Sequence, residues 1–396
     1  MNLILFDDPV IRINLLPFTY TRPVAGIRVG ILTLTEKWER WLKTTPTFQT
    51  AAYLEGKFPK APSAEGALLV NGAVCPDEAL VRSIEDLHEG YFLVKDQLLI
   101  AARAPQGEMN DRNTVSYSGN LTLIDRPWKI FSENGAQIRA DFKLVTAGRN
   151  SAGISDPYTR VYGPENVFVE EGVVIRAAII NAENGPVFLG RNSMVDEGAI
   201  IRGPFSLGAE GHVGMGAKMR NDTSIGPGCR VGGEVSNSVM FANSNKAHDG
   251  YLGCSVIGEW CNLGADTNTS NLKNTFAEVK LWNHAENRFL GTGLQFCGLM
   301  MGDHSKCSIN TMFNTGSVVD VCANVFGEGF PRNYIPSFSW GGMRQLSTYR
   351  LDKALETAAR MMERRKKVFD DTERGILEHV FHMTALHRNW EHKQTV

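Results

Sequence analysis

The sequence predicts an α/β N-terminal domain, then a long parallel β-helix, then a pair of C-terminal helices. Three observations predict this order. Strand and helix patterns alternate over the first 105 residues, aliphatic residues recur every six positions from Leu189, and helical spacing returns after residue 345. Alternating strands and helices are typical of an α/β layer. A sustained period of six is typical of hexapeptide β-helices, and apolar residues three and four apart indicate amphipathic helices.

The N-terminal domain is expected over residues 1–105. Strands are predicted at Leu3–Phe6, Ala67–Val70 and Tyr91–Leu93, and helices at Glu36–Leu42 and Pro76–Leu87. Residues 106–160 are less periodic and are interpreted as a bridge. The β-helix is expected over residues 161–335, and the C-terminal helical segment over residues 336–396.

The repeat begins with eight aliphatic residues in one phase: Leu189, Val195, Ile201, Leu207, Val213, Met219, Ile225 and Val231. The period returns at 257–263 and again at 301–325. Each hexad is expected to give one short strand and one corner, so that three hexads make a triangular coil. The aliphatic residue should point inward, with a small residue four positions later near a corner. The glycine that often follows the aliphatic residue, as at Gly190 and Gly226, is interpreted as supporting a corner with positive φ.

Residues 345–392 are predicted to form two helices that pack on the coils or on a neighbouring subunit. Leu351, Leu355 and Ala358 follow helical spacing, as do Ile376 and Val380. The charged run at 363–367 (ERRKK) is interpreted as a solvated helix face rather than a binding patch.

Composition and charge exclude several classes of protein. The chain has 396 residues, 43% of them apolar and 21% charged, which is typical of a folded protein and not of a disordered one. Lys and Arg number 41 against 43 Asp and Glu, so no basic excess supports a nucleic-acid partner. The chain has no apolar run of about 18 residues and no basic start, so we expect neither a membrane span nor a signal peptide. Seven cysteines without C-x-x-C spacing predict buried, reduced thiols and a cytoplasmic protein.

The strict period of six breaks between Gly232 and Leu252. Function is expected where a regular scaffold becomes irregular. The break contains His248, whose imidazole suits general-base chemistry on an amine or a hydroxyl. On the local sequence alone, a histidine hydrogen-bonded within a loop is an equal interpretation. A metal site is not predicted, because His212 and His304 fall in other coils without paired spacing.

The residues from His248 onward resemble a known family. His248 to Gly253, Ile257 to Thr267 and Asn271 are similar, without a gap, to the acetyltransferase half of bifunctional N-acetylglucosamine-1-phosphate uridylyltransferase/glucosamine-1-phosphate acetyltransferases. They resemble still more closely a variant sugar-nucleotidyltransferase/acyltransferase group of Bacteroidetes-like bacteria and archaea. The resemblance implies a left-handed β-helix, a homotrimer with the site between subunits, and acetyl-CoA as cosubstrate.

The resemblance also implies roles for individual residues. His248 would be the base that deprotonates a sugar amine, while Tyr251 and Asn262 would bind the sugar and its phosphate. Asn271 would hold the amine or the cofactor, and Ala265 would contact acetyl-CoA through its backbone.

Other positions match the family less well. Arg220 is similar to a phosphate-binding arginine only with a two-residue gap, and Lys246 is near enough to His248 to supply a cation. The family's phosphate-binding lysine falls at Ser236, and the aromatic residue expected after Asn271 is Leu272. The acceptor sugar is therefore left open.

The N-terminal half resembles a second family. Residues 15–23 (LLPFTYTRP) resemble the segment after the glycine-rich loop of sugar-1-phosphate nucleotidyltransferases, and residues 68–72 (LLVNG) resemble their strand leading to a metal-binding aspartate. That chemistry needs a glycine-rich turn, a lysine and a carboxylate for Mg²⁺. Here residues 7–12 contain no glycine, the expected lysine is Val24, and the expected aspartate is Ala73.

The candidate nucleotide-binding residues are Arg12, Thr19, Arg22, Asn71 and Gly72, with Mg²⁺ as cofactor if this half is active. A shortened domain that is degenerate or regulatory is the other interpretation.

The sequence therefore predicts a transferase of sugar-nucleotide biosynthesis. Its β-helix would transfer an acyl group from acetyl-CoA to an amino-sugar 1-phosphate or sugar nucleotide, and its N-terminal half could transfer a nucleotidyl group. Two alternatives stay open. One is a uridylyl- or thymidylyltransferase whose β-helix only oligomerises it, and the other is a non-catalytic scaffold that senses a metabolite.

Overall fold

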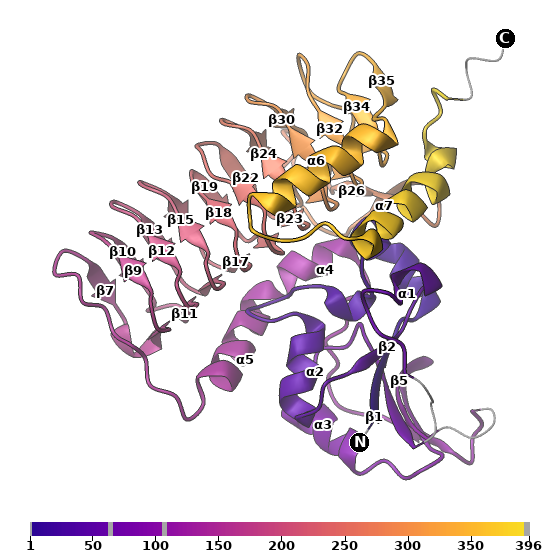
Figure 1. Cartoon of the computed structure of the whole chain (residues 1–396). Helices are drawn as coiled ribbons and strands as arrows, with labels where there is room; N and C mark the ends of the chain where they lie inside the picture. Colours follow the sequence, from indigo (N-terminus) through magenta and orange to yellow (C-terminus); the bar gives the residue numbers. More distant parts are fainter. Residues whose placement is uncertain (1, 62–65, 105–108, 392–396) are drawn as a thin grey trace.

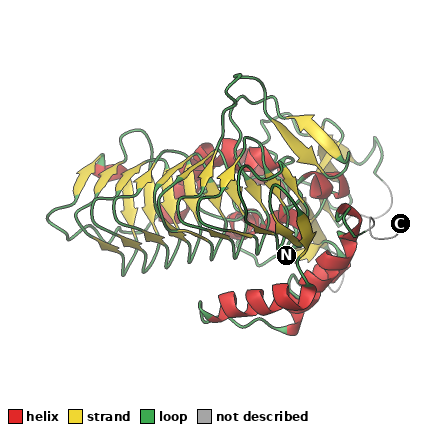
Figure 2. Cartoon of the chain, turned by 90° about the horizontal axis from the view of Figure 1, so that it is seen from above, coloured by secondary structure: helices red, strands yellow, loops and turns green. Residues whose placement is uncertain are grey.

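The computed structural model describes residues 2–61, 66–104 and 109–391 (Figure 1). An N-terminal α/β domain lies against one side of a long parallel β-helix, and two C-terminal helices lie against its last coils. Figure 2 shows the strands stacked in rows along the length of the β-helix. The predicted fold class is therefore confirmed, including the C-terminal helices. Within the described residues, no helix is long and apolar enough to cross a membrane.

The N-terminal domain contains a mixed six-stranded sheet with strand order β2-β1-β3-β5-β4-β6. Its strands are β1 (Asn2–Phe6), β2 (Thr47–Gln49), β3 (Ala67–Asn71), β4 (Phe92–Lys95), β5 (Leu98–Arg103) and β6 (Thr114–Ser116). Strand β1 pairs in parallel with β2 and β3, whereas β5 is antiparallel to β3 and β4. Strand β6 lies in the segment that was interpreted as a bridge, so part of that segment belongs to this sheet.

Three helices accompany this sheet: α1 (Pro9–Asn14), α2 (Leu34–Leu42) and α3 (Glu78–Glu85). Helix α2 begins with a reciprocal cap, in which Thr33 accepts a hydrogen bond from the backbone of Glu36 and Glu36 accepts one from the backbone of Thr33. It buries Trp38, whose indole nitrogen donates to the Val74 oxygen at 2.9 Å. This bond satisfies the polar atom of a side chain that is otherwise fully enclosed.

Helices α4 (Pro127–Ser132) and α5 (Asn134–Thr146) connect the domain to the β-helix. Helix α5 lies between the two halves of the chain. On one side, Asp141 accepts hydrogen bonds from the backbone nitrogens of Ile31 and Leu32. On the other side, Ile138 packs in one apolar cluster with Phe168 and Phe188 of the β-helix. The bridge is therefore a packed element and not a linker.

The β-helix has three long parallel faces. The first face is made by β7 (Arg160–Tyr162), β10 (Ile179–Asn181), β13 (Ile200–Arg202), β16 (Lys218–Met219), β19 (Glu234–Ser236) and β22 (Tyr251–Gly253). It continues as the separate pair β25 (Asn268–Thr269) and β30 (Met312–Phe313).

The second face is made by β8 (Val167–Val169), β11 (Val187–Leu189), β14 (Phe205–Leu207), β17 (Thr223–Ile225), β20 (Val239–Met240), β23 (Val256–Ile257), β28 (Met300–Met301), β31 (Val318–Val319) and β33 (Tyr334–Ile335). The third face is made by β9 (Val174–Ile175), β12 (Met194–Val195), β15 (His212–Val213), β18 (Arg230–Val231), β21 (Asn245–Lys246), β24 (Asn262–Leu263), β29 (Lys306–Cys307), β32 (Asn324–Val325) and β34 (Ser339–Gly341), with β35 (Leu346–Thr348) antiparallel to β34. A hairpin of β26 (Lys280–Asn283) and β27 (Arg288–Gly291) protrudes between the late coils.

The interior of the β-helix follows the hexad pattern. All eight aliphatic residues of the first run are at most 1% exposed. The small residues four positions later, such as Ser193, Ala199 and Cys229, are buried as expected. All seven cysteines are buried and outside any disulfide, which confirms the prediction of buried thiols.

The explanation offered for the corner glycines is wrong. Gly190 and Gly226 have no positive φ, which instead occurs two residues later, at Asn192 and Gly228. These glycines are needed because the next coil passes very close. A Cβ on Gly190 would lie 2.7 Å from the nitrogen of Ala209, and one on Gly226 would lie 1.4 Å from the oxygen of Phe241. The close approach of backbones therefore explains the pattern.

The break in the period corresponds to short coils and not to an inserted loop. In the regular part, Val195 pairs with Val213, eighteen positions later. At the break, Val231 pairs with Lys246, only fifteen positions later, and parallel pairing continues on all three faces. This coil has fewer residues at its corners than a regular coil. The phase of the six-residue repeat therefore shifts along the sequence, while the strands of successive coils still stack in parallel.

The C-terminal segment forms α6 (Leu351–Glu363) and α7 (Asp371–Met383), as predicted. Helix α6 lies along the third face of the β-helix, and α7 lies between the last coils and the N-terminal domain (Figure 1). Lys57 of that domain pairs with Glu373 of α7 at 2.6 Å. The apolar faces of both helices share a cluster with Tyr20 and Phe338. The helices therefore join the two halves of the molecule.

Candidate active site

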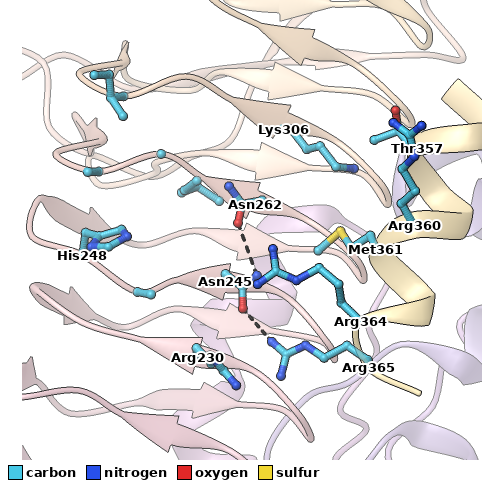
Figure 3. A pocket seen from close by; sticks show the side chains of 15 residues that line it. Arg230, Asn245, His248, Asn262, Lys306, Thr357, Arg360, Met361, Arg364 and Arg365 are labelled. Carbon is cyan, nitrogen blue, oxygen red and sulfur yellow. Dashed lines mark hydrogen bonds between the residues drawn. The ribbon is translucent and has the colours of Figure 1, made fainter. Parts of the chain in front are cut away.

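His248 lies at a corner of the β-helix, just after β21, with its side chain exposed. It lines a pocket of about 650 Å³ between the third face of the β-helix and helix α6 (Figure 3). Asn262 and Ala265, one coil later, line the same pocket. Three of the predicted site residues are therefore brought together, because parallel stacking places equivalent positions of successive coils side by side.

Lys246 occupies the inward position that an aliphatic residue fills in neighbouring coils. It is 1% exposed and does not line the pocket. Its Nζ donates to the backbone oxygens of His248, at 2.5 Å, and Asp249, at 3.0 Å. Burial lowers the pKa of Lys246 to about 8, although the carboxylates of Asp249 and Asp266 oppose the shift. The ammonium therefore holds the corner that carries His248.

Tyr251 and Asn271 meet on the adjoining first face. The Asn271 amide donates to the Tyr251 hydroxyl at 3.2 Å. Burial raises the pKa of Tyr251, with Cys254 as the next cause, so this hydroxyl stays protonated at neutral pH. Arg220 is paired with Glu234 at 3.1 Å, and Glu234 is the neighbour of Tyr251 across β19 and β22. These three predicted residues thus form a second group, separated from the pocket by the corner at His248.

The corner itself borders both groups. His248 and Ala265 also line a second hollow of about 650 Å³, together with Gly233, Asp249 and Asp266. This hollow runs along the edge between the third and first faces. His248 is accordingly accessible from both sides of the edge.

The opposite wall of the first pocket comes from α6 and the turn after it. Arg360, Arg364 and Arg365 line this wall, while Arg230 and Lys306 line the β-helix wall. Figure 3 shows Arg364 and Arg365 reaching from the helix towards the strands that carry Asn245 and Asn262.

Arg364 is exposed and Arg365 is partly buried, and both line the pocket, so the interpretation of residues 363–367 as a solvated face stays a prediction. Sequence reasoning also missed Arg230, Lys306 and Arg360. The available signal was the i,i+4 spacing of Arg360 and Arg364, which places both on one helix face.

The candidate nucleotide-binding residues of the N-terminal half make internal contacts. Arg12 pairs with Asp7 at 2.7 Å and donates to the backbone oxygen of Thr19 at 2.6 Å. The Thr19 hydroxyl donates back to the oxygen of Arg12 at 2.6 Å. The buried Arg22 pairs with Asp303 of the β-helix at 2.5 Å. These contacts engage the polar groups that a nucleotide would use.

The other two candidates lie at the end of β3. The Asn71 amide donates to the oxygen of Leu99 at 3.0 Å and its side-chain oxygen accepts from the nitrogen of Ala73 at 3.0 Å. Gly72 is enclosed, since an added Cβ would lie 3.1 Å from the Cβ of Ala25 and 3.2 Å from the oxygen of Phe6. Both residues shape the turn after the strand.

The nearby carboxylates do not fit a Mg²⁺ site. Asp7 accepts from the nitrogen of Val24, from Thr50 and from Arg12, and Asp8 caps α1 by accepting from the nitrogens of Val10 and Ile11. Among the residues that the structure describes, no three His, Cys, Asp or Glu side chains are placed to hold a metal ion.

The chain is similar to one protein family over its N-terminal part and to several bifunctional enzymes over longer stretches. Residues 3–150 match the family described as sugar nucleotidyl transferase. The chain is 25% identical over 228 residues to the bifunctional protein GlmU of Thermodesulfovibrio yellowstonii, covering 49% of this chain and 50% of that protein. It is 28% identical over 263 residues to a bifunctional sugar-1-phosphate nucleotidylyltransferase/acetyltransferase of Sulfurisphaera tokodaii, covering 63% and 58%.

A shorter alignment has a higher sequence identity. Over 89 residues the chain is 37% identical to the bifunctional protein GlmU of Cupriavidus pinatubonensis, covering 20% of this chain and 19% of that protein. The three matches thus span from a fifth to somewhat over half of the relatives' own lengths. The match to the structure of an Arabidopsis UDP-N-acetylglucosamine acyltransferase has 16% identity and a TM-score of 0.26, and it covers 54% of this chain and 80% of that one. The chain is therefore similar to sugar nucleotidyl transferases over residues 3–150 and to bifunctional GlmU proteins over up to about half of its length.

Proposed function

We propose that the protein is a transferase of sugar-nucleotide biosynthesis whose β-helix transfers an acyl group from acetyl-CoA to an amino-sugar 1-phosphate or a sugar nucleotide. One observation carries the proposal. His248, Asn262 and Ala265, selected by the family resemblance, line a single pocket on the β-helix. The relatives named as bifunctional nucleotidylyltransferase/acetyltransferases support the same reaction class.

In this reaction His248 accepts a proton from the sugar amine as the amine nitrogen attacks the thioester carbonyl. The new carbon–nitrogen bond replaces the carbon–sulfur bond, and the proton goes on to the departing thiolate of CoA. Lys246 acts through the backbone of His248 and positions the base. Asn262 lies beside the base in the pocket and would orient the sugar, and the backbone of Ala265 would contact the acyl donor.

Tyr251, Asn271 and Arg220 lie around the corner from the pocket. We propose that the chain acts as a homotrimer in the cytoplasm and that this second group completes a site on a neighbouring copy. The GlmU-like sequence around these residues supports this arrangement. A light-scattering mass equal to one chain would contradict it.

The decisive experiment measures thiol release with purified protein, acetyl-CoA, and a panel of amino-sugar 1-phosphates and nucleotide amino sugars. His248→Ala should lower the rate at least a hundredfold, the contribution expected of a general base. The matched control is His88→Ala, which removes an exposed histidine of the N-terminal domain. Equal rates for His248→Ala and the parent protein would refute the mechanism.

A second candidate function is nucleotidyl transfer by the N-terminal half, favoured by the family match over residues 3–150. Binding a nucleotide at Arg22 would require the arginine to leave Asp303. The test is pyrophosphate release from UTP or dTTP with Mg²⁺ and a sugar 1-phosphate. Release that His248→Ala leaves intact, without thiol release, would favour this function and make the β-helix a scaffold for oligomerisation. Binding of ligands without any turnover would favour the metabolite-sensing alternative.

A further inference from the structure

The pocket at His248 contains an unusual concentration of positive charge. Five of its fifteen lining residues are cationic, and none is acidic. We call Arg230, Lys306, Arg360, Arg364 and Arg365 the basic clamp. The chain as a whole has a net charge of -2, so this concentration is local.

Most of the charge in the basic clamp is not neutralised by the protein. Arg360 pairs with Glu356 at 2.5 Å, outside the pocket lining. In the described part of the chain, no ion pair involves Arg230, Arg364 or Arg365. Burial lowers the pKa of Arg365, and the neighbouring Arg230 lowers it further. The cations therefore repel one another while remaining charged at neutral pH.

The fold nevertheless holds two of these side chains, Arg365 and Lys306, in place. Arg365 donates to the side-chain oxygen of Asn245 at 2.7 Å, and the Asn245 amide donates to Asn262 at 3.2 Å. This chain of bonds links the turn after α6 to a pocket residue beside His248. Lys306 donates to the backbone oxygen of His304 at 2.8 Å, which fixes its ammonium at the pocket edge. The positions of Arg365 and Lys306 are thus set before any ligand arrives.

We propose that the basic clamp binds the phosphate groups of a multiply phosphorylated ligand whose reactive end lies at His248. Guanidinium groups match phosphate oxygens with paired donors, and a ligand with several negative charges relieves the repulsion among the arginines. The inference rests on the proposed function and adds that a C-terminal helix of the same chain closes the site. The ligand is either acyl-CoA, through its adenosine 3′,5′-bisphosphate end, or a sugar nucleotide, through its diphosphate.

Calorimetric titration of the full chain tests the proposal without catalysis. The probes are adenosine 3′,5′-bisphosphate, UDP and inorganic phosphate at low and moderate salt. At least one of the first two should bind more tightly than inorganic phosphate, and its binding should weaken as salt rises. Binding of the bisphosphate assigns the basic clamp to acyl-CoA, and binding of UDP alone assigns it to the sugar nucleotide.

The test variants are Arg230→Gln and Arg364→Gln, because neither side chain has an ion pair to lose. Each should raise Kd about tenfold or more, since a charge-assisted hydrogen bond is lost. The melting temperature should stay equal or rise as repulsion falls, which shows that the variants fold. Arg160→Gln, an exposed arginine at the far end of the β-helix, should leave Kd unchanged.

The outcomes separate this inference from the proposed function. Unchanged affinity in both clamp variants, or no binding of either nucleotide, refutes the basic clamp even if thiol release occurs. Tight binding that the clamp variants weaken supports the basic clamp even if no acyl acceptor is found. His248→Ala should retain binding of the phosphate probes, because the base acts at the other end of the ligand.

Discussion

The Nζ of Lys246 lies 2.5 Å from the backbone oxygen of His248, inside a coil that otherwise encloses aliphatic side chains. The equivalent residues of the coils before and after are Val231 and Leu263. A charge at this position opposes the hydrophobic packing of the β-helix. Its two bonds to backbone oxygens define the corner that presents the imidazole, which links the irregular coil to the proposed chemistry.

Lys246→Met should change how stability depends on pH. The pKa of Lys246 is about 8 in the folded chain and near 10.5 when unfolded, so between these values the unfolded chain binds more protons. The parent protein should therefore gain stability as pH rises from 8 to 10.5, by about 3 kcal/mol at most. Urea unfolding at pH 7, 8.5 and 10 should show a smaller gain in the variant. The same dependence of stability on pH in the parent protein and the variant would mean that the ammonium is not buried. The control is Lys218→Met, which changes a lysine on the exposed side of β16.

The same substitution should lower catalysis without weakening binding. Without the ammonium, the oxygens of His248 and Asp249 lose their donor, and the imidazole samples more orientations. We expect kcat for thiol release to fall about tenfold while KM stays within twofold, because misplacing a catalytic group affects the transition state most. Steady-state kinetics of Lys246→Met beside Lys218→Met measure this. A rise in KM alone would instead assign Lys246 to substrate binding.

Arg22→Met should destabilise the contact between the two halves. The Asp303 carboxylate would keep its bonds from Thr21 and Glu259 but lose its buried cation. Removing one partner of a buried ion pair costs about 3–5 kcal/mol. The double variant Arg22→Met/Asp303→Asn should recover part of this loss, and urea unfolding in a double-mutant cycle gives the coupling energy. Additive losses would mean that the pair is not coupled.

Gly226→Ala should prevent the coils from stacking. Its Cβ would overlap the backbone oxygen of Phe241 at 1.4 Å, and a backbone atom cannot move aside without shifting the coil. We expect a loss of about 4 kcal/mol or more, or failure to fold. Gly214→Ala is the matched control, because it has the same place in the hexad but its nearest heavy atom is 3.6 Å away. Similar melting temperatures for the two variants would contradict the close approach.

The period of six predicted the β-helix because each coil is encoded locally. A hexad specifies an inward aliphatic residue and a corner within six positions, and stacking repeats the same contact. The helices at 351–363 and 371–383 were likewise evident from their spacing. The family resemblance selected His248, Asn262 and Ala265, which stacking then placed in one pocket.

Only the tertiary structure brought together the residues that contact one another across long stretches of the sequence. Arg22 and Asp303 are 281 positions apart, and Asn245 and Arg365 are 120 apart. No local pattern marks such pairs, because exposed and buried arginines look alike in a sequence. The charge of the pocket depends on where α6 lies on the β-helix, and the apolar cluster that contains Leu355 and Phe338 holds the helix there. The sequence determined the scaffold and the position of His248 on it, and long-range packing decided which charges surround them.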